Sequence, residues 1–65
     1  MKVYFKNSKG KERIIGECED KGEGWKIISL FLKERDYKVY YIREWTNDTG
    51  THYDVGSHSE FFRIQ

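Results

Sequence analysis

The residues with the most evident chemistry lie near the end of the chain, where His52, Asp54 and His58 follow one another closely. Together with Cys18 they supply the nitrogen, oxygen and sulfur donors that zinc accepts. Their spacing matches no zinc pattern, because the chain has one cysteine and six positions separate the two histidines. We therefore expect no metal and no other cofactor, and we expect both histidines at the surface or an edge.

A serine, a histidine and an aspartate also occur together as Ser57, His58 and Asp54. A catalytic triad brings such residues together from distant segments and adds an oxyanion hole and a pocket. Three residues around one turn do not easily reach that geometry, and a thin core leaves no deep cleft. We therefore predict that the protein is not an enzyme. The spacing of Ser57 and Glu60 instead fits a capping box that sets up a tight turn before Phe61.

The elements that position these residues must be few, because the chain has 65 residues. A chain of this length buries only ~60% of the surface that its unfolded form exposes. We expect one domain, residues 1–65, with a thin core. The four Phe, five Tyr and two Trp suit such a core, since each large ring buries about 150–250 Å². So many rings also exclude the composition of a disordered chain.

Charge and cysteine content exclude several classes of protein. The net charge is +1, whereas a nucleic-acid mimic would be far more acidic and a generic DNA-binding protein more basic. Cys18 has no second cysteine to pair with, which excludes a disulfide framework. The opening MKVYFK lacks the apolar run of a signal peptide, and no apolar stretch has the length of a membrane span. We expect a cytoplasmic protein that does not contact membranes.

Hydrophobic periodicity predicts the order of elements. Residues 2–6 and 13–18 alternate as strands around a turn at 7–10, and residues 24–35 follow a helical period. Residues 37–46 form the strongest predicted strand, residues 51–55 return after a turn at 47–50, and residues 61–64 form a short fifth strand or a tail. The predicted fold is an α+β two-layer sandwich, a small antiparallel sheet (β-β-α-β-β) with one helix on one face.

One helix covers one sheet face, so the other face carries the functional question. On the predicted strand 37–46, Tyr40 and Ile42 point one way, opposite to Tyr37, Val39, Tyr41 and Trp45. Whichever set faces the helix, a large ring stays on the open face, with Tyr4 and Tyr53 as candidate additions. Such rings fill a thin core, anchor a protein partner or stack on the bases of a single strand. These three interpretations remain open.

The closing segment supplies the other candidate contacts. Gly56 permits a break in the strand, and Asp54 and Ser57 are suited to bonding local backbone amides. We predict that Phe61 and Phe62 then point to opposite faces, one ring into the core and the other outward. The predicted partner contacts are Tyr40, Tyr53, His58, Phe61 and Phe62.

A basic cluster surrounds the first predicted turn and consists of Lys6, Lys9, Lys11 and Arg13. Such a cluster is suited to phosphate contacts. Lysines also keep a hairpin soluble and protect an edge strand, and we favour that solvated role because the net charge is near zero and the cluster is small. The four residues are the alternative nucleic-acid contacts. The acidic residues Glu17, Glu19, Asp20 and Glu23 are interpreted as a helix-entry cluster.

The stretches VYFKNSKGKERIIGE, YYIREWTNDTG and YDVGSHSEFF resemble a group of small uncharacterised proteins of phages and prophages of Gram-positive bacteria. The resemblance covers nearly the whole chain and implies no site residues. By analogy it implies an accessory protein that binds and inhibits a host or defence protein, in the cytoplasm of a bacterial host if the chain is phage-encoded. We therefore expect protein–protein contact, with self-association to add core. The alternative is a single-stranded nucleic-acid-binding module, and a small ligand held between protomers has no residue signature.

Overall fold

The computed structural model describes residues 1–36, 41–56 and 60–65. The described part contains one helix and a five-stranded antiparallel sheet, which confirms the predicted α+β class. The elements are β1 (Lys2–Lys6), β2 (Glu12–Glu17), α1 (Lys21–Glu34), β3 (Arg43–Asn47), β4 (Gly50–Asp54) and β5 (Phe61–Ile64). The closing segment is therefore a fifth strand and not a tail.

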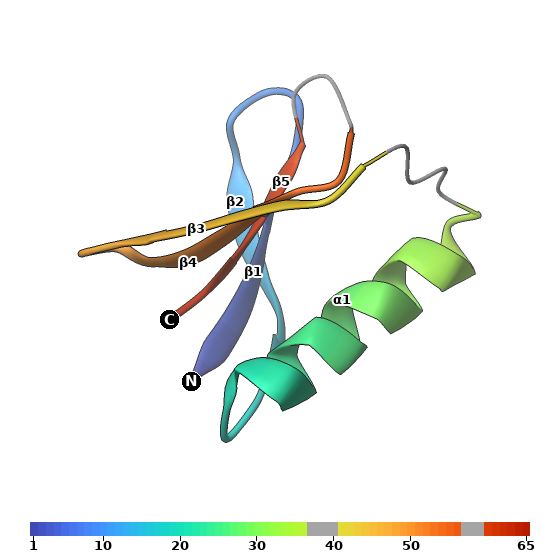
Figure 1. The fold of residues 1–65 in the computed structure, drawn as a ribbon. Coiled ribbons are helices and arrows are strands. Elements are labelled where there is room, and N and C mark those ends of the chain that lie inside the picture. The colour runs from blue at the N-terminus through green and yellow to red at the C-terminus, as the bar shows by residue number, and fades with distance from the viewer. Residues whose placement is uncertain (37–40, 57–59) are drawn as a thin grey trace.

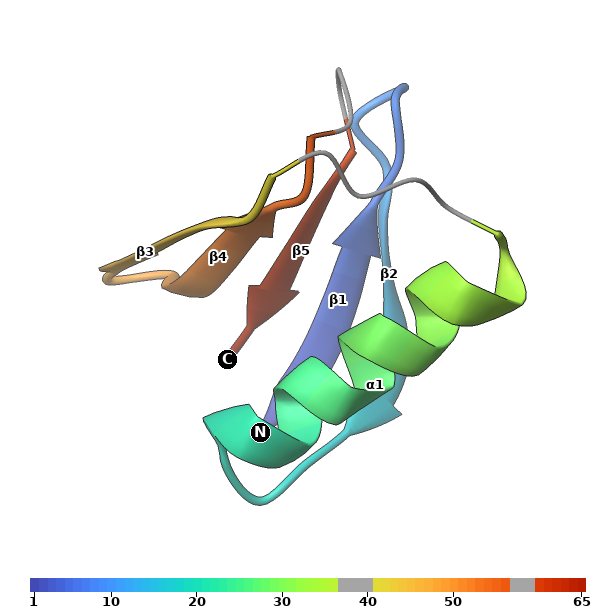
Figure 2. The ribbon, with the colours of Figure 1, turned by 45° about the vertical axis from the view of Figure 1, so that its right-hand side comes forward.

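The strands lie in the order β2-β1-β5-β4-β3. The last strand, β5, lies between the hairpin of β1 and β2 and the hairpin of β3 and β4, and it pairs with β1 and β4. Helix α1 lies on one side of this sheet (Figures 1 and 2). Lys2 and Gln65 exchange two backbone hydrogen bonds, of 2.7 and 3.0 Å, so the two chain ends lie side by side.

Helix α1 begins at Lys21, three residues before the predicted start at position 24. The reason is a capping box. The Asp20 carboxylate accepts a hydrogen bond of 2.9 Å from the backbone N–H of Glu23, whose carboxylate accepts one of 2.7 Å from that of Glu19. The predicted helix-entry role is confirmed for Glu19, Asp20 and Glu23, whereas Glu17 is the last residue of β2. At 14 residues, this one helix of the described part is too short and polar to cross a membrane.

The core lies between α1 and the sheet. Two buried helix residues, Ile28 and Leu32, face a layer of buried residues on β1, β4 and β5, with Val55 just after β4; that layer consists of Val3, Phe5, Tyr53, Val55, Phe62 and Ile64. Three rings meet inside it, because Phe5 lies 4.9 Å from Phe31 and 5.3 Å from Phe62 between centroids. The predicted helix stripe therefore faces the sheet.

The strand predicted at residues 37–46 is shorter in the structure. Residues 37–40 lie outside the described part, and β3 begins only at Arg43. The physical reason is that β4, its pairing partner, ends at Asp54. Gly56 has a φ of 85°, so the chain turns away there and leaves Tyr41 and Ile42 without a strand to pair with.

Candidate functional site

The sheet face away from α1 is the candidate site, and we call it the outer face. Pairing between strands assigns its members, because residues directly opposite in a sheet point to the same side. Arg63 is paired with both Tyr4 and His52, and His52 with Trp45. The side chains of the outer face that bear on function are Tyr4, Lys6, Glu12, Ile14, Trp45, His52, Phe61 and Arg63.

Arg63 organises the middle of the outer face. Its guanidinium carbon lies 4.1 Å from the centroid of the Tyr4 ring. Its Nε and Nη2 donate to the two oxygens of Glu12, at 3.0 and 2.7 Å, and Nη1 donates to the carbonyl of Thr49 at 2.9 Å. Hydrogen bonding to Arg63 lowers the pKa of the Glu12 carboxyl, and the same bond raises the pKa of Arg63. Arg63 therefore fixes β2, β5 and the turn after β3 relative to one another.

An aromatic cluster lies beside Arg63. Trp45 is 37% exposed, and the ring of His52 stacks on it at 5.3 Å with planes 8° apart. Phe61 presents an edge-to-face contact to Trp45 at 6.5 Å. The His52 Nε2 lies 2.9 Å from the Thr49 hydroxyl, which holds the imidazole against the turn. A hollow of about 510 Å³ opens on this cluster, lined by Lys6, Glu12, Trp45, Thr49, His52, Phe61, Phe62 and Arg63.

The structure separates the predicted partner contacts. Phe62 is 1% exposed and lies in the core, whereas Phe61 lies on the outer face, so the two rings do point to opposite faces. Tyr53 is 3% exposed and packs on Trp25 of α1 at 5.1 Å, so its assignment to the contact surface is wrong. Its register opposite Phe62 puts it on the helix side. Tyr40 and His58 lie outside the described residues.

The basic cluster does not form one surface. Lys6 lies on the outer face, where it lines the hollow. Arg13 lies on the helix side, with its guanidinium 6.0 Å from the Phe5 ring and 5.7 Å from the Phe31 ring. Lys9 and Lys11 are exposed around the turn, where their backbone N–H groups donate to the Asn7 side chain. A continuous phosphate-binding finger is therefore not assembled by these four residues.

Asp54 has a structural environment. It is 4% exposed and accepts hydrogen bonds of 3.2 Å from both Tyr41 and Arg43. Its other oxygen accepts a bond from the N–H of Gly56, which confirms its predicted role in a local turn. Among the described residues, no three histidine, cysteine or carboxylate side chains converge as metal ligands would. Ser57 and His58 lie outside the described residues; His58 belongs to both the metal set and the triad set considered in the sequence analysis, and Ser57 to the triad set.

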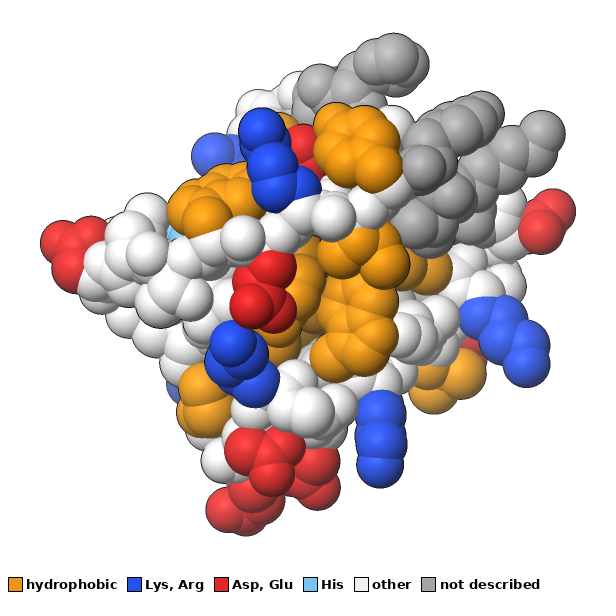
Figure 3. Space-filling model, viewed as in Figure 1, with side chains coloured by type: hydrophobic (Ala, Val, Ile, Leu, Met, Phe, Trp, Pro, Cys, Tyr) orange, Lys and Arg blue, Asp and Glu red, His pale blue; other side chains and the backbone are white. Residues whose placement is uncertain are grey.

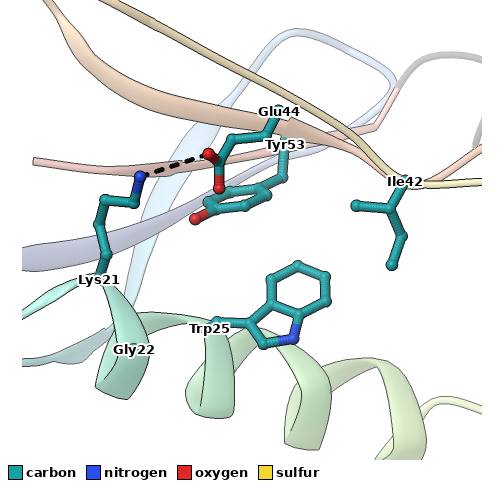
Figure 4. Close-up of a pocket in the computed structure, with 6 residues that line it drawn as sticks. All are labelled: Lys21, Gly22, Trp25, Ile42, Glu44 and Tyr53. Carbon is teal, nitrogen blue, oxygen red and sulfur yellow. Dashed lines mark hydrogen bonds and ion pairs between the residues drawn. The ribbon is translucent and has the colours of Figure 1, made fainter.

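A second hollow, of about 420 Å³, lies on the helix side between α1 and β3, and we call it the lateral groove. Figure 4 shows its lining: Lys21, Gly22, Trp25, Ile42, Glu44 and Tyr53. Lys21 and Glu44 form an ion pair of 3.3 Å across one end. Hydrophobic side chains gather over this part of the molecule, with acidic and basic ones beside them (Figure 3). The sequence did not reveal the groove, because it depends on where β3 begins.

The environment of Tyr53 predicts an alkaline loss of stability. Burial and the neighbouring Glu44 carboxylate raise the pKa of the Tyr53 hydroxyl from 10.0 to about 12. The unfolded chain ionises first, so the stabilisation is complete below pH 10 and is lost as the pH rises to about 12. The loss is about 2–3 kcal/mol, at 1.36 kcal/mol per pKa unit. Between pH 10 and about 12, the free energy of unfolding in urea should decrease less for Tyr53→Phe than for the parent. Equal decreases in the two proteins would contradict the assignment of this pH dependence to Tyr53.

The fold and the site define a small α+β protein whose sheet carries one buried face and one face of exposed and half-buried rings with ordered charges. Comparisons with protein-family models, curated proteins and solved structures find no match for the chain. Its function must therefore be inferred from this geometry.

Proposed function

We propose that this chain is a non-enzymatic binding protein of the phage accessory type, and that its outer face contacts another protein. One observation carries the proposal. Trp45 and Ile14 are 37% and 52% exposed on the sheet face that α1 leaves open, with Tyr4 and Phe61 half-buried beside them. Exposed rings gathered on one face are typical of protein contact surfaces, where tyrosine and tryptophan contribute most of the binding energy.

The order of the outer face supports a role in recognition. Arg63 is held at three acceptors by Glu12 and Thr49, and His52 is held between Trp45 and Thr49. Side chains that are already fixed lose little conformational freedom when a partner binds. The hollow of about 510 Å³ beside Trp45 and Phe61 suits an apolar side chain of the partner. The Lys6 ammonium on its wall suits an acceptor such as a carboxylate.

Single-stranded nucleic acid fits this face less well. Base stacking needs a free ring face, but His52 stacks on Trp45 and Arg63 lies over Tyr4. Phosphate contacts need cations along one path, whereas Lys6 and Arg13 lie on opposite sides of the sheet. The net charge of +1 adds little attraction for a polyanion. These observations favour a protein as the partner.

The proposal is tested by comparing three immobilised proteins in a lysate of a Gram-positive bacterium, with and without nuclease treatment. Phe61→Ser removes a ring of the outer face, and Leu30→Ser changes a side chain of α1 that is 57% exposed. We expect the parent and Leu30→Ser to retain the same protein. Phe61→Ser should retain it at least about tenfold less well, as for a residue that contributes strongly to an interface. Equal capture by all three, or capture that nuclease removes, would contradict the proposal.

A further inference from the structure

Strand β3 forms one edge of the sheet, and its outer backbone groups face away from β4. All five of its residues, Arg43–Asn47, are exposed. An antiparallel strand uses alternate residues for pairing on each side, so the outward N–H and C=O groups of β3 are available to a further strand. No strand in the described part of the chain pairs with them. Such an edge is a template for strand addition.

The opposite edge, β2, is better protected than β3. Pairing between β1 and β2 shifts register at Val3 and Tyr4, which twists that edge, and β2 carries the charges of Glu12, Arg13 and Glu17. Helix α1 also packs on β2. By contrast, β3 pairs with β4 without a register shift and contains neither lysine nor proline, although it carries two charges of opposite sign, Arg43 and Glu44. The hairpin of β3 and β4 extends away from α1, so the helix leaves space beside β3 (Figure 1).

The sequence of β3 is complementary to itself in one antiparallel register. A two-fold axis perpendicular to the sheet, through Trp45, pairs all five residues of each strand. The two Trp45 rings then lie side by side, Arg43 faces Asn47 of the second copy, and Glu44 faces its Thr46. Moving the axis to Arg43 or to Glu44 places two like charges opposite each other, which destabilises pairing.

We propose that β3 pairs with β3 of a second copy of this chain in that register, giving a two-fold dimer with a continuous ten-stranded sheet. Because the axis is perpendicular to the sheet, both helices lie on one side and both outer faces on the other. The dimer thus doubles the exposed aromatic surface and joins the two Trp45 rings at its centre. This inference does not depend on whether the outer face binds another protein.

Two substitutions at one position test the register. Thr46 faces Glu44 of the second copy, so Thr46→Lys creates two attractive pairs per dimer and Thr46→Glu creates two repulsive pairs. Both variants lose the same 3.1 Å contact between the hydroxyls of Thr46 and Thr51, so this loss does not distinguish them, and urea unfolding of each monomer measures the remaining difference in stability. By sedimentation equilibrium of the full chain, we expect the dimer dissociation constant of Thr46→Glu to exceed that of Thr46→Lys by roughly tenfold.

A parent protein that stays monomeric at roughly millimolar concentration would overturn the dimer, because a dissociation constant above that value is too weak for a specific strand-paired dimer. A dimer whose dissociation constant is the same in both variants would overturn the β3 interface. If neither variant folds, amide hydrogen exchange of the parent protein tests whether β3 forms the interface. The outward amides of β3 should become more protected as the protein concentration rises, and protection that is independent of concentration would contradict the proposal.

Discussion

Replacing Phe62 with alanine is expected to remove a large fraction of the free energy of unfolding. The ring is 1% exposed and contacts Phe5 at 5.3 Å and Phe31 at 5.6 Å, so its removal leaves a cavity in the middle of the core. Such a truncation costs about 3–5 kcal/mol. A domain of this size has only roughly 3–10 kcal/mol of stability in total, at 0.05–0.15 kcal/mol per residue.

Phe61→Ala is the matched control for this prediction. Its ring lies on the outer face against Trp45, so we expect a folded protein with a loss of about 1 kcal/mol or less. Urea unfolding followed by far-UV circular dichroism measures both variants. Equal destabilisation by the two substitutions would show that both rings are structural, and would remove Phe61 from the proposed contact surface.

Gly50→Ala is expected to destabilise the protein more strongly than Gly10→Ala, the corresponding change in the first turn. Gly50 has a φ of 119°, and an added Cβ would lie 2.5 Å from the backbone oxygen of Ile64. The conformation alone costs about 1–3 kcal/mol for another residue. The oxygen cannot easily move, because the neighbouring Gln65 is bonded to Lys2 in both directions. The clash therefore adds to the conformational cost.

Gly10→Ala separates the two contributions. Gly10 has a φ of 82° with nothing within 4 Å of an added Cβ, so its substitution costs the left-handed conformation only, about 1–2 kcal/mol. We expect the thermal midpoint of Gly50→Ala to fall clearly below that of Gly10→Ala. Similar midpoints would mean that the end of β5 moves freely, contrary to its pairing with β1.

The sequence was sufficient for the architecture because periodicity and turn chemistry act locally. The alternation of residues 2–6, the helical stripe with Ile28 and Leu32, and the acidic residues at the helix entry each depend on neighbouring residues. The opposite orientation of Phe61 and Phe62 follows from strand geometry in the same way. These local signals were enough to predict a helix on a small antiparallel sheet.

The parts that depend on pairing between distant segments could not be predicted. The alternation of residues 51–55 showed which residues share a sheet face with Tyr53, but not whether that face is covered by the helix. Only the pairing of Tyr53 with Phe62 of β5 shows that it lies on the core side. The start of β3 depends on the end of β4 at Asp54. The bidentate contact of Arg63 with Glu12 joins residues 51 positions apart. No spacing rule in the sequence brings these two residues together.

The most direct test of the outer face as a protein contact surface is photo-crosslinking from single positions. A benzophenone-bearing residue in place of Ile14 reports on the outer face, and the same residue in place of Leu30 reports on the exposed side of α1. We predict a crosslinked protein band from position 14 in bacterial lysate and none from position 30. A band from position 30 alone, or crosslinks from position 14 to nucleic acid only, would contradict the account.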